Sequence, residues 1–285
     1  MIKLKSAQLL PHRKAHIAFI VKGTFYVHGG LDENDSTSDS IFCLDLIKKT
    51  WEQQPLVGDV EGLHDHKCAI IGNENEKDQY FKQYSKNSML EKVSHRAESI
   101  QDVSVDHRRS HSSLSKANPK KNKKADMSWA KEFKVYIFGG RNKKGEGSST
   151  LWCLKAESNN WRKSIVETKG TPPRPRIYHS MSYVKSTKYF AVIGGAHIPP
   201  TNTTQYELIG DFFLFDLLNL IWINVKFNDA SLKRSNASAC ENDEGSILMF
   251  GGTGAKNFVD GMLYKLTMLT DISELSPVQT ILPMA

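Results

Sequence analysis

Four pairs of adjacent glycines each end a short run of strand-forming residues, and this repetition constrains the fold more than any other feature of the chain. The runs read FYVHGG, VYIFGG, FAVIGG and ILMFGG. Glycine weakens a strand, but it adopts positive φ angles and allows another backbone to approach closely. Four such endings therefore predict a repeated unit in which a strand runs into a crowded bend. The eight glycines are Gly29, Gly30, Gly139, Gly140, Gly194, Gly195, Gly251 and Gly252.

A second strand follows each diglycine in a nearly fixed register. An aromatic residue stands twelve positions after the second glycine in three copies, and eighteen positions after it in the copy with a longer loop. A tryptophan follows nine positions later in three copies. Large aromatic side chains bury much apolar area, so these residues are predicted to fill the space between neighbouring units. The aromatic residues are Phe42, Trp152, Phe213 and Tyr264, and the tryptophans are Trp51, Trp161 and Trp222.

One long segment interrupts the second repeat. Successive diglycines are 110, 55 and 57 residues apart, and removing residues 73–131 shortens the first interval to 51. Repeats of this length are typical of solenoids, propellers or arrays. Residues 64–72 (HDHKCAIIG) have the character of a first strand, and FKVYIFGG supplies the second. The insertion is therefore predicted to lie between the first and second strands of repeat two.

The insertion differs from the rest of the chain in composition. The chain has a formal net charge of +7, and residues 73–131 hold 13 Lys and Arg against 8 Asp and Glu, a difference of +5. This polar, serine-rich segment has few large apolar residues, so disorder is predicted. Its basic run 119–124 would act as a nuclear-import signal or nucleic-acid patch, or simply as solvated charge. Ser110, Ser112 and Ser113, beside two arginines, are candidate phosphorylation sites.

The apolar strand, the diglycine, the aromatic residue and the spaced tryptophan together resemble the kelch repeat. The resemblance covers about residues 10–72 and 132–269. It implies an all-β fold, a β-propeller whose blades are four-stranded antiparallel sheets. Kelch propellers usually have five to seven blades, whereas about four are recognisable here. Two alternatives remain: a small closed ring, or an open arc that self-association, a partner chain or further blades would complete.

The resemblance also suggests a division of the chain. The outer strand of the last blade, near residues 262–269, would come from residues 1–9 or from the tail sequence PVQTILP. The predicted segments are 1–72 for repeat one and the first strand of repeat two, 73–131 for the insertion, 132–269 for the remaining repeats and 270–285 for the tail.

The sequence gives no support for catalysis. It has no nucleophile elbow, phosphate-binding loop or paired-carboxylate motif, and the four cysteines lack metal-ligand spacing. His16 and His179 follow Arg13 and Arg176 at the same three-residue spacing, where the kelch resemblance implies a structural role. We therefore expect no metal, no cofactor and no enzyme activity. The alternative is a kelch enzyme related to galactose oxidases or to lyases and epimerases.

No apolar run approaches the roughly 20 residues that a membrane helix needs, and the N-terminal residues lack the apolar stretch of a secretory signal. A cytoplasmic protein is therefore expected, with nuclear import through residues 119–124 as an alternative. Membrane partners are not expected, and nucleic acid would bind only through the basic insertion.

The kelch resemblance implies a protein-interaction scaffold that binds an unidentified protein through loops at one end of the blades. Such a function rests on fold-level analogy. A structural subunit of a cytoskeletal assembly is an alternative. The loops that follow the diglycines are 31–39, 141–149, 196–210 and 253–261, and their candidate contact residues are Asp32, Glu33, Arg141, Lys143, Asn202 and Lys256.

Overall fold

The computed structural model is built almost entirely of β-strands. Short 3-10 helices, η3 (Ala230–Leu232) and η4 (Ala255–Asn257), occur in the fourth repeat. No helix among the described residues is long and apolar enough to cross a membrane. The residues that the structure describes are 10, 12–21, 24–45, 49–59, 61–72, 133–157, 160–197, 206–226, 230–257, 259, 261–267 and 281–283.

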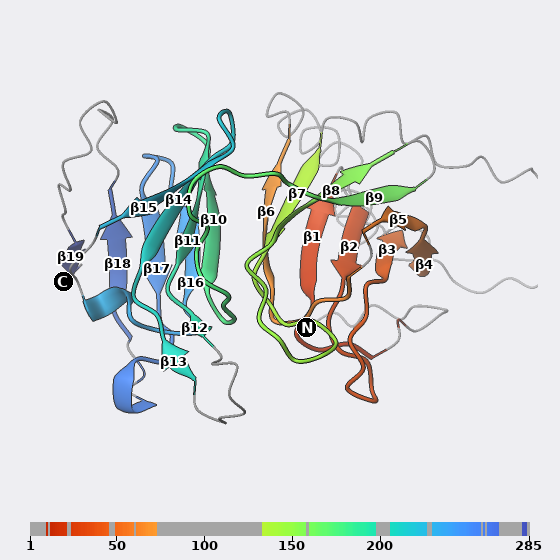
Figure 1. Cartoon of the computed structure of the whole chain (residues 1–285), viewed down its shortest axis with the longest axis horizontal. Coiled ribbons are helices and arrows are strands. Elements are labelled where there is room, and N and C mark those ends of the chain that lie inside the picture. Colours follow the sequence, from red (N-terminus) through yellow and green to blue (C-terminus); the bar gives the residue numbers. More distant parts are fainter. Residues whose placement is uncertain are drawn as a thin grey trace, which may run out of the picture.

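The strands form one antiparallel sheet for each predicted repeat, which we call blades one to four (Figure 1). Blade one contains β1 (Ile17–Val21), β2 (Thr24–His28), β3 (Ile41–Asp45) and β4 (Thr50–Gln54). Blade two contains β6 (Lys67–Ile71), β7 (Lys134–Phe138), β8 (Leu151–Ala156) and β9 (Trp161–Ile165). Blade three contains β10 (Ser180–Val184), β11 (Tyr189–Ile193), β14 (Phe212–Asp216) and β15 (Ile221–Val225). Blade four contains β16 (Ser238–Glu241), β17 (Ile247–Phe250), β18 (Leu263–Leu266) and β19 (Ile281–Pro283).

Parallel pairing links the chain between blades to the next blade. β5 (Leu56–Gly58) follows blade one and pairs in parallel with β9, the outer strand of blade two. A single parallel bridge between Lys169 and Ile221 repeats this arrangement at the outer strand of blade three. In each case the connecting chain adds to the outer edge of the blade that it enters, so an otherwise unpaired edge is partly covered.

The blades pack face to face in sequence order, as a propeller requires. The first strand of each blade lies innermost: β6 is beside β1 and β10, and β10 is beside β16. No comparable contact joins β16 to β1 among the described strands. The kelch-type propeller arrangement of four blades is therefore confirmed.

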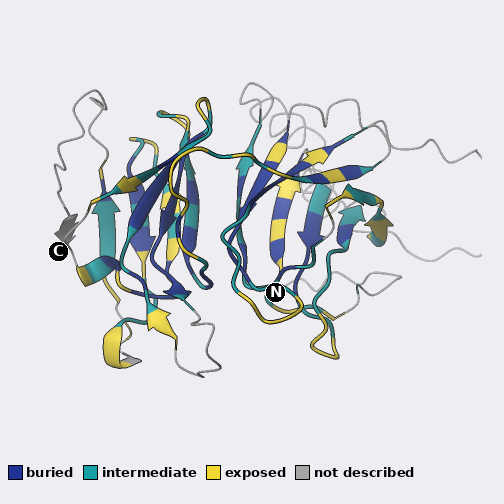
Figure 2. Cartoon of the chain, viewed as in Figure 1, coloured by how far each residue is buried: buried dark blue, intermediate teal, exposed yellow. Residues whose placement is uncertain are grey.

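Apolar clusters fill the contacts between successive blades. Phe19 of blade one packs with Trp161 of blade two, and Phe138 of blade two packs with Trp222 of blade three. The third contact joins Ile193 of blade three to blade four. Along β1 buried and exposed residues alternate, so one face of that strand enters the first cluster (Figure 2). The tryptophans of blades two and three, Trp161 and Trp222, therefore lie between neighbouring blades.

The diglycines lie where neighbouring blades approach most closely. Both glycines of blade two have positive φ angles, +69° at Gly139 and +90° at Gly140. A Cβ atom on Gly139 would lie 2.7 Å from the Arg176 carbonyl oxygen of blade three. One on Gly140 would lie 2.8 Å from the Cβ atom of His66 in blade two. The first glycine thus makes room for the next blade, and the second for the first strand of its own blade.

A backbone hydrogen bond joins each of the first three blades to its successor beside the diglycine. The N–H group of Gly140 donates to the Arg176 carbonyl at 2.9 Å. The N–H group of Gly30 donates to the Leu63 carbonyl and that of Gly195 to the Arg234 carbonyl, both at 2.8 Å. The same bond therefore recurs at every contact between successive described blades.

A cation covers the aromatic residue of the third strand in every blade. In blade three the guanidinium of Arg176 lies 5.8 Å from the ring of Phe213 and donates to the Gly194 carbonyl at 3.0 Å. Arg176 also binds Asp211 through two hydrogen bonds of 2.5 and 2.8 Å. Blades one and four repeat the stacking and the bond to the first glycine with Arg13 over Phe42 and Arg234 over Tyr264.

Blade two replaces this arginine with a lysine from a different strand. Leu63 stands at the arginine position, and the Lys163 ammonium from β9 lies 4.5 Å from the centre of the Trp152 ring. Lys163 is fully buried and donates to the Glu61 carbonyl. Burial lowers the pKa of Lys163 to about 8. The cation–π contact is thus retained although the sequence position has changed.

The interrupted repeat and the last blade follow the sequence prediction in outline. β6 ends at Ile71 and pairs with β7, which begins at Lys134, so the insertion lies between the first two strands of blade two. The tail supplies the outer strand of blade four, because β19 pairs with β18. The predicted insertion 73–131 and the alternative outer strand 1–9 lie outside the described residues.

Candidate functional site: the loop face at the diglycine end

The loops that follow the four diglycines lie at the same end of the blades, the lower end in Figure 1. We call this end the loop face and define it by the described parts of 31–40, 141–150, 196–210 and 253–259. Antiparallel bridges tie each loop to the segment that enters its own blade, as between His64 and Arg141 or Ser235 and Thr253. The loops are therefore anchored at their base by the blade.

Two of these loops are shaped by the same side-chain turn. In blade one the Asp32 carboxylate accepts hydrogen bonds of 2.9 Å from the N–H groups of Asn34 and Ser36. In blade two the side-chain oxygen of Asn142 accepts from Lys144 at 2.9 Å and from Glu146 at 3.0 Å. Asx turns of this kind fix a loop without a buried core. Asp32, a predicted contact residue, thus helps to hold its own loop.

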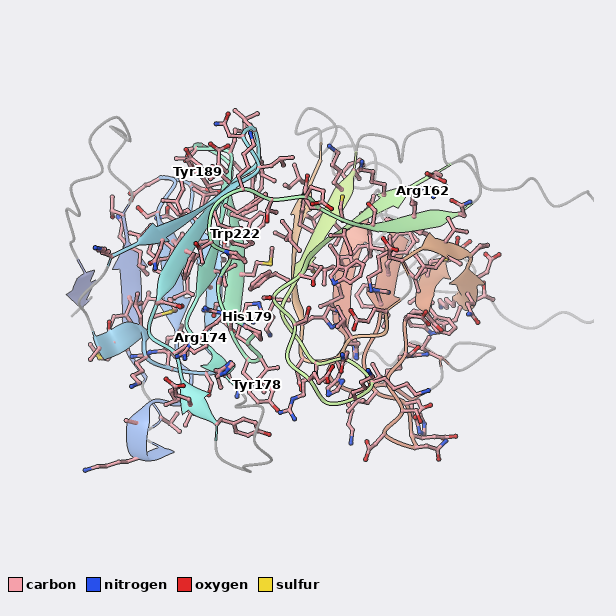
Figure 3. All side chains as sticks on the ribbon, viewed as in Figure 1. Arg162, Arg174, Tyr178, His179, Tyr189 and Trp222 are labelled. Carbon is pink, nitrogen blue, oxygen red and sulfur yellow. The ribbon has the colours of Figure 1, made fainter. Side chains whose placement is uncertain are left out.

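At the middle of the loop face, side chains from blades two and three meet in a group that we call the central cluster: Asp65, Arg141, Tyr178 and Tyr206. The Arg141 guanidinium donates to the Tyr206 hydroxyl at 2.8 Å and lies 5.2 Å from the centre of the Tyr206 ring. The rings of Tyr178 and Tyr206 meet edge to face at 6.1 Å. Figure 3 shows Tyr178 at this lower end, with Arg162 toward the opposite end.

Electrostatic contacts extend the cluster into blade one. Asp65 lies 4.0 Å from Arg141 Nε and 3.8 Å from His64 Nε2, and its side chain is 15% exposed. The other ring nitrogen of His64 lies 3.3 Å from the hydroxyl of Thr37 in blade one. Burial raises the pKa of Asp65, and the nearby His64 and Arg141 lower it. Burial also lowers the pKa of His64. Three blades therefore contribute to one partly desolvated polar group.

Arg141 carries the positive charge of the cluster, and most of its side chain is buried. Its side chain is 20% exposed. Its Nε atom is buried and forms no hydrogen bond with the described residues. A buried donor of this kind costs free energy unless a partner atom satisfies it. Tyr206, which is 48% exposed, stands beside it as an accessible aromatic surface. The cluster thus combines an accessible ring with an unsatisfied cationic donor.

The other predicted contact residues are spread over the loop face. Glu33, Lys143 and Lys256 are exposed on the loops of blades one, two and four. Lys256 has a φ angle of +56°, so its loop turns sharply there. Asn202 lies outside the described residues. The structure therefore brings Arg141 into the central cluster and leaves Glu33, Lys143 and Lys256 on separate loops.

The sequence prediction missed Asp65, Tyr178 and Tyr206. A signal for two of them exists in the repeat. Asp65 and Tyr178 occupy the same repeat position, one residue before His66 and His179. In blades one and four this position holds Ala15 and Asn236. All four have φ angles between +55° and +60°. A non-glycine residue in this conformation directs its side chain from a tight bend, and such residues are often functional. Aligning the four copies at this position would have drawn attention to it.

A separate cavity of about 700 Å³ lies between the inner strands of the four blades. Its wall in blade four contains the carboxylates of Glu241, Asp243 and Glu244, and its other walls include Ala18, Cys68 and Met181. Glu241 accepts a hydrogen bond of 2.8 Å from the backbone N–H of Lys185. Among the residues that the structure describes, no group of three His, Cys, Asp or Glu side chains is placed to hold a metal ion.

The histidines at this position of the repeat are structural where a preceding blade covers them. His66 and His179 are buried between blades, and burial holds the pKa of each well below its usual range. His16 occupies the same position in blade one but is exposed. The predicted structural role therefore holds for His179, whereas no described blade packs over His16.

Comparison with known proteins agrees with the repeat pattern. Residues 95–280, well over half of the chain, match the family model described as the KLHDC2/KLHL20/DRC7 Kelch-repeats domain. Residues 13–55 match the Kelch motif. The chain is also 28% identical over 119 residues to Kelch domain-containing protein 2 of Bos taurus. That alignment covers 42% of this chain and 27% of the relative, so the chain spans about a quarter of the relative's length.

Proposed function

The chain belongs to the Kelch-repeat family, and we propose that it is a non-catalytic scaffold that binds a protein partner through the loop face. The observation that supports this most strongly is the central cluster. Arginine and tyrosine are the residue types most enriched among the side chains that dominate protein–protein binding energy. Here they stand at the middle of a face whose loops are held in place by the blades.

The geometry of the cluster suits binding better than it suits chemistry. Tyr206 offers an exposed ring, and the Arg141 guanidinium, whose side chain is 20% exposed, places a positive charge beside it. Asp65 balances the arginine charge at 4.0 Å, so an incoming group need not be strongly acidic. A partner that covered the cluster would exclude water from these contacts and strengthen them. The exposed loops around it would then select the partner by charge.

Capture of a partner from a cell extract tests this proposal. The full chain is immobilised, and the proteins retained by wild type are compared with those retained by Arg141→Ala and Tyr206→Ala. Each substitution is expected to weaken binding of the same partner by about 30-fold, the effect of removing a residue that dominates an interface. Circular dichroism spectra matching wild type would show that each variant is folded.

Arg162→Ala provides the matched control. Arg162 is also an arginine with an ion pair, to Glu157 at 2.5 Å, but its side chain is 50% exposed and it lies toward the opposite end of the blades (Figure 3). The Arg162→Ala variant should retain the partner as wild type does. If wild type captured no protein, or if Arg141→Ala and Arg162→Ala behaved alike, the loop-face proposal would be wrong.

A further inference from the structure

The two outer faces of the blade arc are more exposed than the equivalent faces inside it. We call the side of a blade that meets the preceding blade its leading face, and the side that meets the following blade its trailing face. The residue before each diglycine lies on the trailing face. His28, Phe138 and Ile193 are 1%, 0% and 2% exposed at this position, whereas Phe250 of blade four is 54% exposed. The position that is buried against the following blade in blades one to three is therefore exposed to solvent in blade four.

The leading face of blade one is partly open: Val27 on this face is 2% exposed, but residues farther along the face are less buried than their equivalents in the other blades. On the second strand, Val135, Phe190 and Ile247 of blades two, three and four are fully buried, whereas Phe25 of blade one is only half-buried. The tryptophan of the fourth strand is also half-buried in blade one, and its ring lies 6.1 Å from that of Phe25. The arc thus ends in one open leading face and one open trailing face.

These two faces carry the same types of residue as the faces that pack together inside the arc. Inside the arc, trailing Phe138 meets the leading side of blade three, where it contacts Trp222 with ring centres 5.0 Å apart. The same positions hold Phe250 on the open trailing face and Trp51 on the open leading face. The contacts between blades one and two and between blades two and three also place a histidine of the following blade, His66 or His179, beside the first glycine, and His16 occupies this place in blade one. The faces are therefore complementary to each other.

We propose that the partner on these faces is a second copy of this chain, with blade four of each copy packed on blade one of the other. One chain provides one face of each kind, so two copies make the same contact twice and can close as a twofold ring. Such a ring would contain eight blades, within the range of four to eight that propellers adopt. Closure would bury the exposed phenylalanine and leave no open blade face in the described arcs. This pairing is independent of partner binding at the loop face.

Light scattering on the purified full chain tests the pairing. We expect a mass of twice the chain's 32.1 kDa at micromolar concentration. Phe250→Glu on the trailing face and Phe25→Glu on the leading face should each raise the dissociation constant of the dimer by at least about 30-fold. Leu218→Glu is the control, because Leu218 is 79% exposed in the turn between β14 and β15, away from both faces. That variant should remain a dimer.

Mixing the two variants distinguishes this head-to-tail pairing from a symmetric one. Phe250→Glu chains keep an intact leading face, and Phe25→Glu chains keep an intact trailing face. Their mixture should therefore form a heterodimer through one native contact, although each variant alone is a monomer. A monomeric wild type, a mass above the dimer, or a dimer unaffected by both substitutions would overturn the proposal, as would a mixture that stayed monomeric while both variants remained folded.

Discussion

Replacing Gly139 with alanine is expected to destabilise the chain by about 2–5 kcal/mol, because two separate costs combine at this position. Gly139 has a φ angle of +69°, and an L-residue in the left-handed region costs about 1–2 kcal/mol. The new Cβ atom would also lie 2.5 Å from His179 Cε1 and 2.7 Å from the Arg176 carbonyl oxygen. Forcing extra volume into a packed contact costs about 1–3 kcal/mol more.

Gly145→Ala separates the two costs. Gly145 has a φ angle of +80° in the loop after the same diglycine, but no atom lies within 4 Å of its added Cβ. Its alanine variant should lose only the backbone term, about 1–2 kcal/mol. The difference of about 1–3 kcal/mol between the variants is therefore the part due to contact with blade three.

Urea denaturation followed by tryptophan fluorescence measures both variants. With a denaturant slope of about 3 kcal/mol per molar, the midpoint of Gly139→Ala should fall about 0.3–1 M below that of Gly145→Ala. The slopes themselves should remain equal, because neither substitution changes the area exposed on unfolding. Equal midpoints for the two variants would refute the assignment of the diglycine to the contact between blades.

Three further substitutions test individual buried charges and ion pairs. Burial lowers the pKa of Lys163 to about 8 from 10.5, so the folded state loses this proton at lower pH than the unfolded state does. The wild type should therefore gain stability relative to Lys163→Met as pH rises from 8 to 10.5. A constant difference in unfolding free energy across this range would contradict the buried ammonium. Burial likewise lowers the pKa of His28 to about 3 from 6.5, so wild type should lose stability relative to His28→Phe as pH falls from 6.5 to 3, measured by urea titrations at each pH. Phenylalanine is chosen because blade two has Phe138 at this position. If the unfolding free energies of wild type and His28→Phe fell equally with pH, His28 would not be buried between blades. Arg176→Met should cost about 3 kcal/mol because it removes a fully buried guanidinium and leaves Asp211, which is 28% exposed, without its partner. Arg174→Met removes an exposed pair and should cost less than about 1 kcal/mol in the same assay; equal costs would contradict the burial of Arg176.

The blade framework could be predicted from the sequence because its requirements are local. A diglycine, an aromatic residue and a tryptophan at fixed spacing describe one blade, and each blade repeats them. The strand before Gly139 runs over Lys134–Phe138, and Trp161 begins β9. Even the interrupted repeat could be reassembled, because the first strand at Lys67–Ile71 keeps the repeat pattern across the insertion.

The central cluster could not be predicted from the repeat, because it depends on which loops meet in space. Asp65 and Arg141 come from blade two, and Tyr178 and Tyr206 from blade three. No spacing within one copy brings them together. The exchange of an arginine for Lys163 is similar, since the replacing cation comes from the fourth strand, 100 residues after Leu63. Both features follow from packing between strands that are distant in the sequence.

The difference between His16 and His179 also depends on neighbouring blades. The two residues occupy the same place in the repeat and have the same local sequence signal. His179 is fully buried because blade two packs against it, whereas His16 is exposed on the leading face of blade one. The sequence therefore predicts the position of a residue within its blade, and the arrangement of blades determines its environment.

Amide hydrogen exchange at the second glycine of each diglycine tests the face-to-face packing of the blades most directly. The N–H groups of Gly30, Gly140 and Gly195 each donate to a carbonyl of the following blade at 2.8–2.9 Å. In a packed propeller they open only when a contact between blades opens, so they should exchange as slowly as the amides within β7 and β11. Rapid exchange at these three glycines, with the strand amides still protected, would show that the repeats fold as separate sheets and would contradict the propeller.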